Sequence, residues 1–587
     1  MVPCIQIDLR SRREYARGYI EELLQRIQLL KDVVNAAPLD HEAQEVMGLN
    51  GPLVYHGEDS ITSMARLVEA AVGEQVSNTS LSDIGMDVAR EREHAVGIET
   101  FPAEFPSRDT AQQLFASYLN GLHLLHPFLH RPTLLRELND AYTRPEALNS
   151  PSMFRINMVF AIGSVALVRA GLHVIPPMNY YAAAMQHGDK CLGLSALQHI
   201  QGLLLILLFS LQHDISIGSK WDLSRVAMRI CVENRLHKKN PQAIDLAAEQ
   251  MRRRIFWACY ISDRHSSSVL GKPVAIQDAD IEAELPIDAD DDLITTGNID
   301  GQMLRGMSEV SAQLRQIQLR RITSKIGMSL YRKAANWQDN NSPRIVDEII
   351  DELDQWRRRF PIVSQPHNVY ESIQWRDLNY FRECLKCFRV LALQSPESGT
   401  SYLDRVTEAA SQVVMLYQAM RTKDNLILNW TCVHDMMSAG FTNLYCGIAR
   451  RDVARNDNMA ACSWHEKWST IHRTTLAVIE VLSYIAAKWP TATTHVRVFE
   501  ALAARVAHSM EPTPWDTTNI VLRPTATVRP SGLEDAGSWD ADFGRYAEMW
   551  DAALAAFLDE PLDLGNLDWG AVDWDAMQVF SDDQQQR

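Results

Sequence analysis

Apolar residues recur at helical spacing along most of the chain. From residue 109 to about residue 510 they fall three and four positions apart almost without interruption, which is the period of one face of an α-helix. This region has no run of alternating apolar and polar residues between turn signals, so we expect neither a β-sandwich nor a parallel sheet. The pattern predicts an all-α fold with a large helical body over residues 108–510. An acidic loop at residues 287–302 is expected to separate two helical halves.

One segment of the body has the clearest helix signal. Three arginines at 252–254 stand where we expect the helix to begin, and Gly271 and Pro273 are expected to end it. The apolar stripe that follows the arginines predicts a buried face. Beyond the helix, scattered apolar residues are spaced along an extended acidic loop. The residues expected in the core are Ile255, Phe256, Trp257, Cys259 and Tyr260.

A short helix is predicted before the body, at residues 19–35. β-Branched residues occupy every a position of its two heptads and leucines occupy both d positions, which favours a parallel two-stranded coiled coil and hence a homodimer. Two heptads are short for a coiled coil, and a single amphipathic helix docked on the body is the alternative. Residues 36–107 are weakly patterned and are typical of a linker. The seam residues are Ile20, Leu23, Ile27, Leu30 and Val34.

Negative charge is concentrated at the C-terminal end of the chain. The 587 residues carry a formal net charge of −17, and residues 534–587 hold 14 acidic against two basic side chains. The net charge argues against a surface that binds nucleic acid broadly, although the body without this segment is only mildly acidic. Prolines and threonines mark residues 511–532 as a second linker, so residues 533–587 form a separate, largely flexible segment.

The arginine-containing helix and its loop resemble the signature of the fungal-specific transcription factor domain. This domain is the regulatory middle region of six-cysteine binuclear zinc-cluster regulators. Ser267 fits a serine of that signature, Lys272 replaces an arginine, and residues 279–286 fit its Ile-Asp-x-x-Leu-Pro-like loop. The other residues that carry the resemblance are Arg253, Arg254, Phe256, Trp257, Tyr260, Asp263, Arg264, Leu270, Gly271 and Pro273.

Other segments follow in the order that the family would have them. Residues 118–132 look like its "Tyr…His…Pro-x-x-His-Arg-Pro" element, and residues 154–163 look like the helix after it. Residues 221–237 fit its "Trp…Ala-x-Arg…Leu-His" helix with three departures. The family usually has Gly, Leu and Gly at the positions of Arg225, Asn234 and Arg235. Without the glycine before Leu236, the geometry of that helix end is an open question.

The first eighteen residues resemble the end of a zinc cluster and its basic linker. Cys4 would be the last ligand of a cluster whose other five cysteines precede Met1; an ordinary thiol is the alternative. Zinc is expected for the family, but a two-metal cluster needs six thiolates, so this chain alone cannot bind it. DNA would then be read by a module that is missing here. Weak contacts with DNA phosphates are expected from Arg10, Arg12, Arg13 and Arg17.

The sequence argues against a dedicated enzyme. It contains no P-loop, dinucleotide fingerprint, Gly-x-Ser-x-Gly or His-Glu-x-x-His motif. His123, His126 and His130 have a spacing that suggests a metal face, but Pro127 interrupts the helix between them. Asp263 and Arg264 are expected to form an internal salt bridge or a cap rather than an acid–base couple.

Nine scattered cysteines indicate reduced thiols in an intracellular protein. The only close pair, Cys384 and Cys387, lies within a helical pattern and is expected to pack in the core. The most apolar run, residues 202–211, is too short to cross a bilayer and predicts a buried helix. No membrane association is expected.

Together these features imply a nuclear transcription regulator of RNA polymerase II-dependent genes. Its helical body would sense a signal or restrain the activity of the regulator. Its tail, in which acids alternate with large apolar residues, is typical of an activation segment that binds transcriptional coactivators. A C-terminal helix packed on the body is the alternative for the tail. For the whole chain, the alternative is a scaffold or co-regulator that does not bind DNA and joins other regulators through residues 19–35. The tail residues expected to anchor on a coactivator are Trp569, Trp574 and Phe580.

Overall fold

The computed structural model divides the chain into two compact units, Gly57–Pro561 and a smaller unit of Met1–His56 with Leu562–Arg587. The coiled-coil seam, Cys4, the four N-terminal arginines and the activation tail lie outside the described residues. The structure describes residues 5–7, 14–16, 68, 101–188, 195–213, 220–241, 245–296, 307–331, 342–394, 400–423, 426–456 and 461–509.

The smaller unit contains a short antiparallel strand pair. Strand β1 (Ile5–Ile7) pairs with β2 (Glu14–Ala16), with Ile5 opposite Ala16 and Ile7 opposite Glu14. The sequence predicted the end of a zinc cluster and its basic linker here and did not predict the strand pair, because three-residue strands are too short to show the two-residue period.

Every regular element among the described residues of the larger unit is helical, which confirms the all-α prediction. The first half of this unit comprises α5 (Arg108–Leu119), α6 (Leu122–Leu125), α7 (Arg131–Thr143), α8 (Ser150–Arg169), α9 (Pro177–Met185), α11 (Ala196–Ser210), α12 (Lys220–Glu233) and α13 (Leu246–Leu270). The second half comprises α14 (Asp291–Thr296), α15 (Ser311–Ile326), α16 (Ser342–Arg359), α17 (Ile373–Gln394), α18 (Thr400–Thr422), α19 (Trp430–Asn456), α20 (Ala461–Lys488) and α21 (Thr493–Ser509). Short 3₁₀ turns occur at Pro145–Ala147, Asp278–Asp280, Val369–Glu371 and Pro490–Ala492, and a π-helical turn follows α15 at Gly327–Tyr331.

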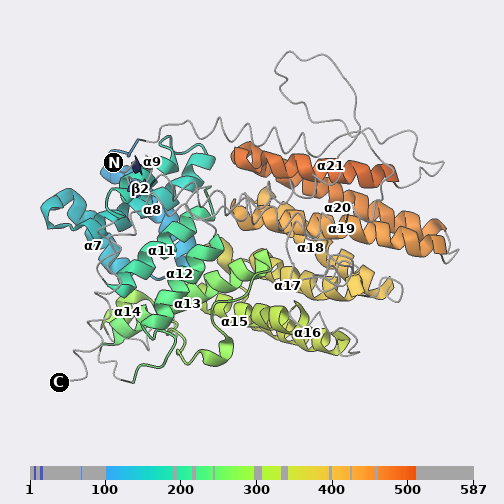
Figure 1. Cartoon of the computed structure of the whole chain (residues 1–587), viewed down its shortest axis with the longest axis horizontal. Helices are drawn as coiled ribbons and strands as arrows, with labels where there is room; N and C mark the ends of the chain where they lie inside the picture. The colour runs from blue at the N-terminus through green and yellow to red at the C-terminus, as the bar shows by residue number, and fades with distance from the viewer. Residues whose placement is uncertain are drawn as a thin grey trace, which may run out of the picture. The chain divides into compact units, whose positions relative to one another are not determined.

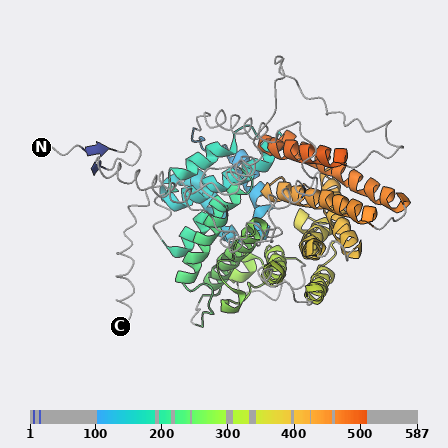
Figure 2. The same cartoon turned by 45° about the vertical axis from the view of Figure 1, so that its right-hand side comes forward.

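The second half is a stack of long helices. Each helix from α16 to α21 packs against the next one in the chain, and Figure 1 shows α17 to α21 lying side by side. In the first half, α5, α9 and α11 pack around α8, and α12 packs between α11 and α13. Helix α13 also contacts α15 and thus connects the two halves (Figure 2).

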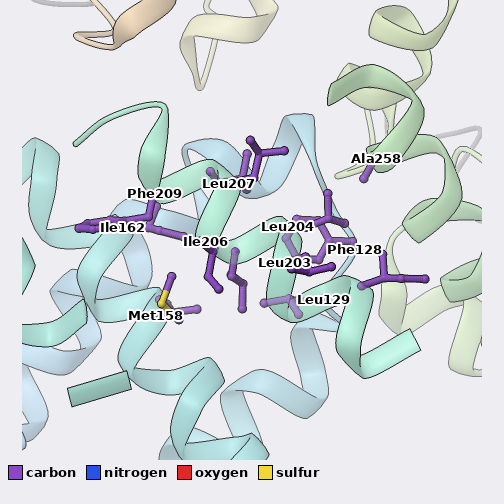
Figure 3. Close-up of a cluster of buried hydrophobic side chains, with 14 of the residues drawn as sticks. Phe128, Leu129, Met158, Ile162, Leu203, Leu204, Ile206, Leu207, Phe209 and Ala258 are labelled. Atoms are coloured by element: carbon purple, nitrogen blue, oxygen red, sulfur yellow. The ribbon is translucent and has the colours of Figure 1, made fainter. Parts of the chain in front are cut away.

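The core of the first half forms around α8 and α11. Their side chains interdigitate with Phe128 and Leu129 from the segment before α7 (Figure 3). Helix α5 lies so close to α8 that a Cβ on Gly163 would stand 2.1 Å from the Leu114 carbonyl oxygen. By length and composition α8 could cross a membrane, and it is the one such helix among the described residues, but 72% of its apolar window is buried within the protein. Helix α11 is a buried core helix, as predicted.

Two predicted boundaries were wrong. Helix α13 begins at Leu246, where the Asp245 carboxylate accepts a hydrogen bond from the Ala247 amide at 2.9 Å, so the three arginines lie beyond its first turn. The predicted loop at 287–302 contains α14, and Asp291 at its start is buried. The density of acids in this segment suggested exposure, but one of them pairs with a buried arginine far away in the sequence.

The structure shows how α12 ends without glycine. Arg235 is the one non-glycine residue with positive φ among the described residues, at 56°. The Leu236 amide donates to the Cys231 carbonyl at 2.8 Å and the Arg235 amide donates to the Val232 carbonyl at 3.0 Å, the bonds of a Schellman motif. The chain therefore keeps the turn that the family's usual glycine would favour, and it does so with a strained residue.

Replacing Arg235 with glycine is expected to stabilise the protein by about 0.5–1 kcal/mol. Glycine relieves the strain of the left-handed backbone conformation, which is about 1–2 kcal/mol. It also increases the conformational entropy of the unfolded chain, which offsets part of that gain. The free energy of unfolding from urea denaturation measures the gain. Arg235→Ala removes the same side chain and keeps the Cβ, so it is the control. Equal stability of the two variants would contradict this explanation.

Candidate functional site

The face of α13 that carries the family-like signature is buried, as predicted. Phe256, Trp257 and Tyr260 are fully buried, and the Trp257 ring packs edge-on against the other two rings at centroid distances of 5.1 and 5.0 Å. Gly271 ends the helix with φ of 64°, also as predicted. The signature therefore forms part of the protein interior.

The signature side chains hold the following loop against α13. The Trp257 Nε1–H donates to the Glu284 carbonyl at 2.9 Å, the Tyr260 hydroxyl to Asp278 at 2.5 Å, and an Arg264 Nη2–H to the Ile276 carbonyl at 2.7 Å. Arg253 pairs with Glu284 and donates to the Leu285 carbonyl, while the Ser267 hydroxyl donates to the Pro273 carbonyl at 3.1 Å. We call these bonds between α13 and residues 271–291 the helix–loop contacts.

Asp263 and Arg264 form the predicted internal salt bridge. Arg264 Nη1 lies 2.6 Å from an Asp263 carboxylate oxygen, and both side chains are buried. The Ala275 amide also donates to Asp263 at 3.1 Å. Burial raises the pKa of Asp263, and the Arg264 charge opposes that rise. Because each group is held by the other and by the loop, this pair supports structure rather than acid–base chemistry.

A second buried ion pair joins α13 to the start of α14. Arg254 pairs with Asp291 and also donates to the Ala289 carbonyl at 3.2 Å. Asp291 accepts a further bond from the Arg131 amide at 2.8 Å, so three segments meet at one carboxylate. Charges of this kind are retained in an interior only when they are paired.

The three histidines at 123, 126 and 130 do not form a metal centre. His123 packs against Tyr118, and burial lowers its pKa to about 3; His130 Nδ1 lies 2.8 Å from the Thr133 hydroxyl oxygen. Throughout the described part of the chain, no group of three or more histidine, cysteine or acidic side chains is arranged to hold a metal ion. Cys384 and Cys387 are buried on α17, in accord with core packing, and burial raises the pKa of Cys384 to about 12.

A cavity of about 120 Å³ lies between the two halves of the larger unit. Its walls come from α6, α11 and α13 on one side, and from α15, α17, α18 and the turn at Val369–Glu371 on the other. The walls are mostly apolar and aromatic, including Leu207, Ile261, Tyr370, Trp375 and Met420. The polar residues that line it include His126, His265, Gln316, Arg320, Asn379 and Arg382.

Contacts beside the cavity connect the halves directly. The Trp430 amide donates to the Leu211 carbonyl at 2.8 Å, and His265 Nε2 lies 2.9 Å from the Thr431 hydroxyl oxygen. Sequence reasoning missed the cavity because its lining residues are spread over some three hundred positions in short, unconnected pieces. The one signal in the sequence that could have indicated the cavity was arginine at positions 320 and 382, each within a helical apolar pattern.

A second cavity, of about 150 Å³, lies beside the C-terminal end of α13. Arg264, Ser267 and Lys272 line it together with Thr323 and Ser324 from α15. Arg264 is already paired with Asp263 at 2.6 Å and lies 3.4 Å from Asp278. The Arg264 charge at this cavity therefore serves the helix–loop contacts.

Residues 113–358 match the family model described as the fungal specific transcription factor domain. This region of the chain is a fungal-specific transcription factor domain. The match contains α13, the loop after it and all the helix–loop contacts. The resemblance of the α13 signature to that family is thus confirmed by an independent comparison, and the helices from α17 onward lie beyond the matched region.

Curated fungal proteins are similar to this chain over stretches longer than the matched domain. The chain is 23% identical over 521 residues to a positive regulator of purine utilization from Emericella nidulans, a match covering 68% of this chain and 49% of that protein. It is 25% identical over 346 residues to pyrimidine pathway regulatory protein 1 of Saccharomyces cerevisiae, covering 55% and 36%. An ABC-transporter-regulating transcription factor of Aspergillus fumigatus is 26% identical over 277 residues, covering 46% and 30%. The chain thus spans about half or less of the length of these relatives.

Proposed function

We propose that this chain is a fungal transcription regulator of RNA polymerase II-dependent genes that acts in the nucleus. The observation that carries the proposal is the domain at residues 113–358, whose signature residues make the helix–loop contacts. The charged signature residues are paired with each other or with the loop, which supports a structural role for the signature. The similarity to two pathway regulators and to an ABC-transporter-regulating transcription factor supports the same proposal.

In this proposal the large helical unit is the regulatory body and the acidic C-terminal segment is the output. DNA binding is expected from a zinc cluster that would end at Cys4, with a homodimer formed through Ile20 to Val34. The tail would contact coactivators. Zinc, DNA, dimerisation and coactivators are predictions from the sequence, because the residues concerned lie outside the part of the chain that the structure describes.

The proposed output can be tested with the tail alone. Residues 533–587, fused to an unrelated DNA-binding module, are expected to activate a reporter gene. The combined change of Trp569, Trp574 and Phe580 to Ala is expected to remove most of that activity, because these aromatics supply the surface that anchors on a partner.

Asp573→Asn is the matched control for this experiment. It removes one charge from the same stretch and keeps every aromatic residue, so we expect only a small loss of reporter activity. A wild-type fusion without activity, or a triple variant as active as the wild type, would contradict the proposed activation segment.

A further inference from the structure

We propose that the cavity between the two halves binds a small planar anion, of the size and chemistry of a monocyclic carboxylate. The proposal rests on four observations: unpartnered polar atoms at the cavity, an excess of positive charge around it, its size, and its position between two groups of helices.

Several buried polar atoms at the cavity have no hydrogen-bond partner among the residues that the structure describes. They are Arg320 Nε, Gln316 Oε1 and one ring nitrogen, Nδ1, of both His126 and His265. Arg320 and Gln316 are each 4% exposed and His126 is 7% exposed. Leaving a buried donor or acceptor unsatisfied costs about 1–3 kcal/mol, so the gathering of such atoms on one cavity points to a bound molecule that pairs with them.

The charge balance around the cavity favours an anion. The two charged side chains that line it are both cations, Arg320 and Arg382. Behind this lining their carboxylate partners are Glu383 and Asp435, and Glu383 also pairs with a third cation, Lys386. Asp435 is already engaged: Arg382 Nε lies 2.9 Å away and the Tyr417 hydroxyl donates to it at 2.5 Å. Glu383 is shared between Arg320, at 3.4 Å, and Lys386, at 3.3 Å.

Arg320 is therefore the cation with the weakest pairing, and it lines the cavity. Burial lowers the pKa of Arg320 to about 10, and the Arg382 charge acts in the same direction, while Glu383 and Asp435 oppose the shift. The same local excess acts on His265, whose pKa is lowered by burial and then by Arg320, Arg382 and Lys386. A ligand carboxylate beside Arg320 would accept from its guanidinium and supply the missing negative charge.

Size and lining restrict the rest of the ligand. A dry cavity of about 150 Å³ holds benzene, so a cavity of about 120 Å³ fits a single ring of similar size or smaller. Trp375 and Tyr370 offer aromatic faces, and Leu207 and Met420 offer apolar contact. Neutral histidines present one N–H or one lone pair to the cavity, and Gln316 Oε1 accepts a bond from a ring N–H or hydroxyl.

The position of the cavity indicates what occupancy would do. A ligand there contacts α6, α11 and α13 of the first half and α15, α17 and α18 of the second half at once. Binding would stabilise the arrangement in which the halves are closed on each other, and so provide the input of the regulatory body. Only this last step rests on the proposed function, since binding itself is measured on purified protein.

The experiment uses the purified 587-residue chain and six probes of matched size. Benzoate, nicotinate and furan-2-carboxylate are the anions, benzyl alcohol and benzamide are neutral, and benzylamine is the cation. We expect at least one carboxylate to raise Tm and to give saturable heat in titration calorimetry, with no effect from benzylamine. Absence of binding by all three carboxylates, or equal binding of benzylamine, would overturn the proposal.

Variants then assign the binding to this cavity. Arg320→Met is expected to weaken carboxylate affinity by about tenfold or more, which corresponds to about 1.4 kcal/mol. Arg315→Met makes the same chemical change on the same helix, outside the cavity lining, and should leave affinity unchanged. Gln316→Leu and Arg320→Lys are used if Arg320→Met does not fold, and both should weaken binding. Unchanged affinity in a folded Arg320 variant would refute the site, whereas reporter activity without ligand binding would refute the site and leave the transcriptional proposal intact.

Discussion

Replacing Arg254 with methionine is expected to destabilise the helical body by about 3–5 kcal/mol. The substitution leaves Asp291 buried without the Arg254 charge, while the Arg131 amide still donates to it. Breaking a buried ion pair by removing one partner costs this much because an uncompensated charge stays in the interior. Urea denaturation followed by far-UV circular dichroism measures the change.

A double substitution separates the cost of leaving one buried charge unpaired from the net contribution of the ion pair to stability. Arg254→Met with Asp291→Leu removes both charges and is expected to be considerably more stable than Arg254→Met alone. Arg229→Met is the control, because its pair with Glu233 is exposed and contributes little. If Arg254→Met and Arg229→Met had the same small effect, the structural role of the Arg254–Asp291 pair would be refuted.

Truncation of Trp257 to alanine is expected to cost about 3–5 kcal/mol and to abolish soluble expression. The ring is fully buried between Phe256 and Tyr260, and its Nε1–H holds the Glu284 carbonyl of the loop. Soluble yield and the free energy of unfolding are the measurements.

Trp257→Phe is the matched variant for the tryptophan. It keeps an aromatic ring in place and loses the hydrogen bond to the loop, so we expect a cost well below that of alanine. Soluble Trp257→Ala protein within about 1 kcal/mol of the wild type would show that the signature face does not form part of the core.

The sequence predicted the interior of α13 well and its surroundings poorly. Apolar periodicity placed Phe256, Trp257 and Tyr260 in the core, and glycine placed the end of the helix at residue 271. Both predictions depend on residues that are close together in the sequence, so the sequence alone is enough to make them. The start of α13 was missed, because Asp245 as an N-cap has no strong apolar pattern behind it and the arginines suggested a helix entry.

Long-range pairing explains the remaining differences. Asp291 looks like one acid among several in a solvated loop, and only the fold brings Arg254 to it across 37 positions. The helix–loop contacts were not predicted for the same reason, although the resemblance selected the residues that make them. The cavity combines side chains from helices far apart in the sequence, so no spacing in the chain could have indicated it.

The helix–loop contacts and the cavity both concern the connection between the two halves. The helix–loop contacts fix α13 as the connection between the two halves, and the cavity lies where the halves meet. A regulatory body needs such a connection if an event at one group of helices is to change the other. The signature therefore maintains the structure through which regulation would act, and it contacts neither DNA nor a substrate in this account.

The most direct measurement of the central claim uses the whole chain tethered to an unrelated DNA-binding module upstream of a reporter gene. We expect the tethered chain to change reporter transcription, and we expect the combined change of Trp569, Trp574 and Phe580 to Ala to abolish the effect while protein abundance stays equal. A tethered chain that is nuclear and abundant but leaves transcription unchanged would contradict the conclusion that this protein is a transcription regulator.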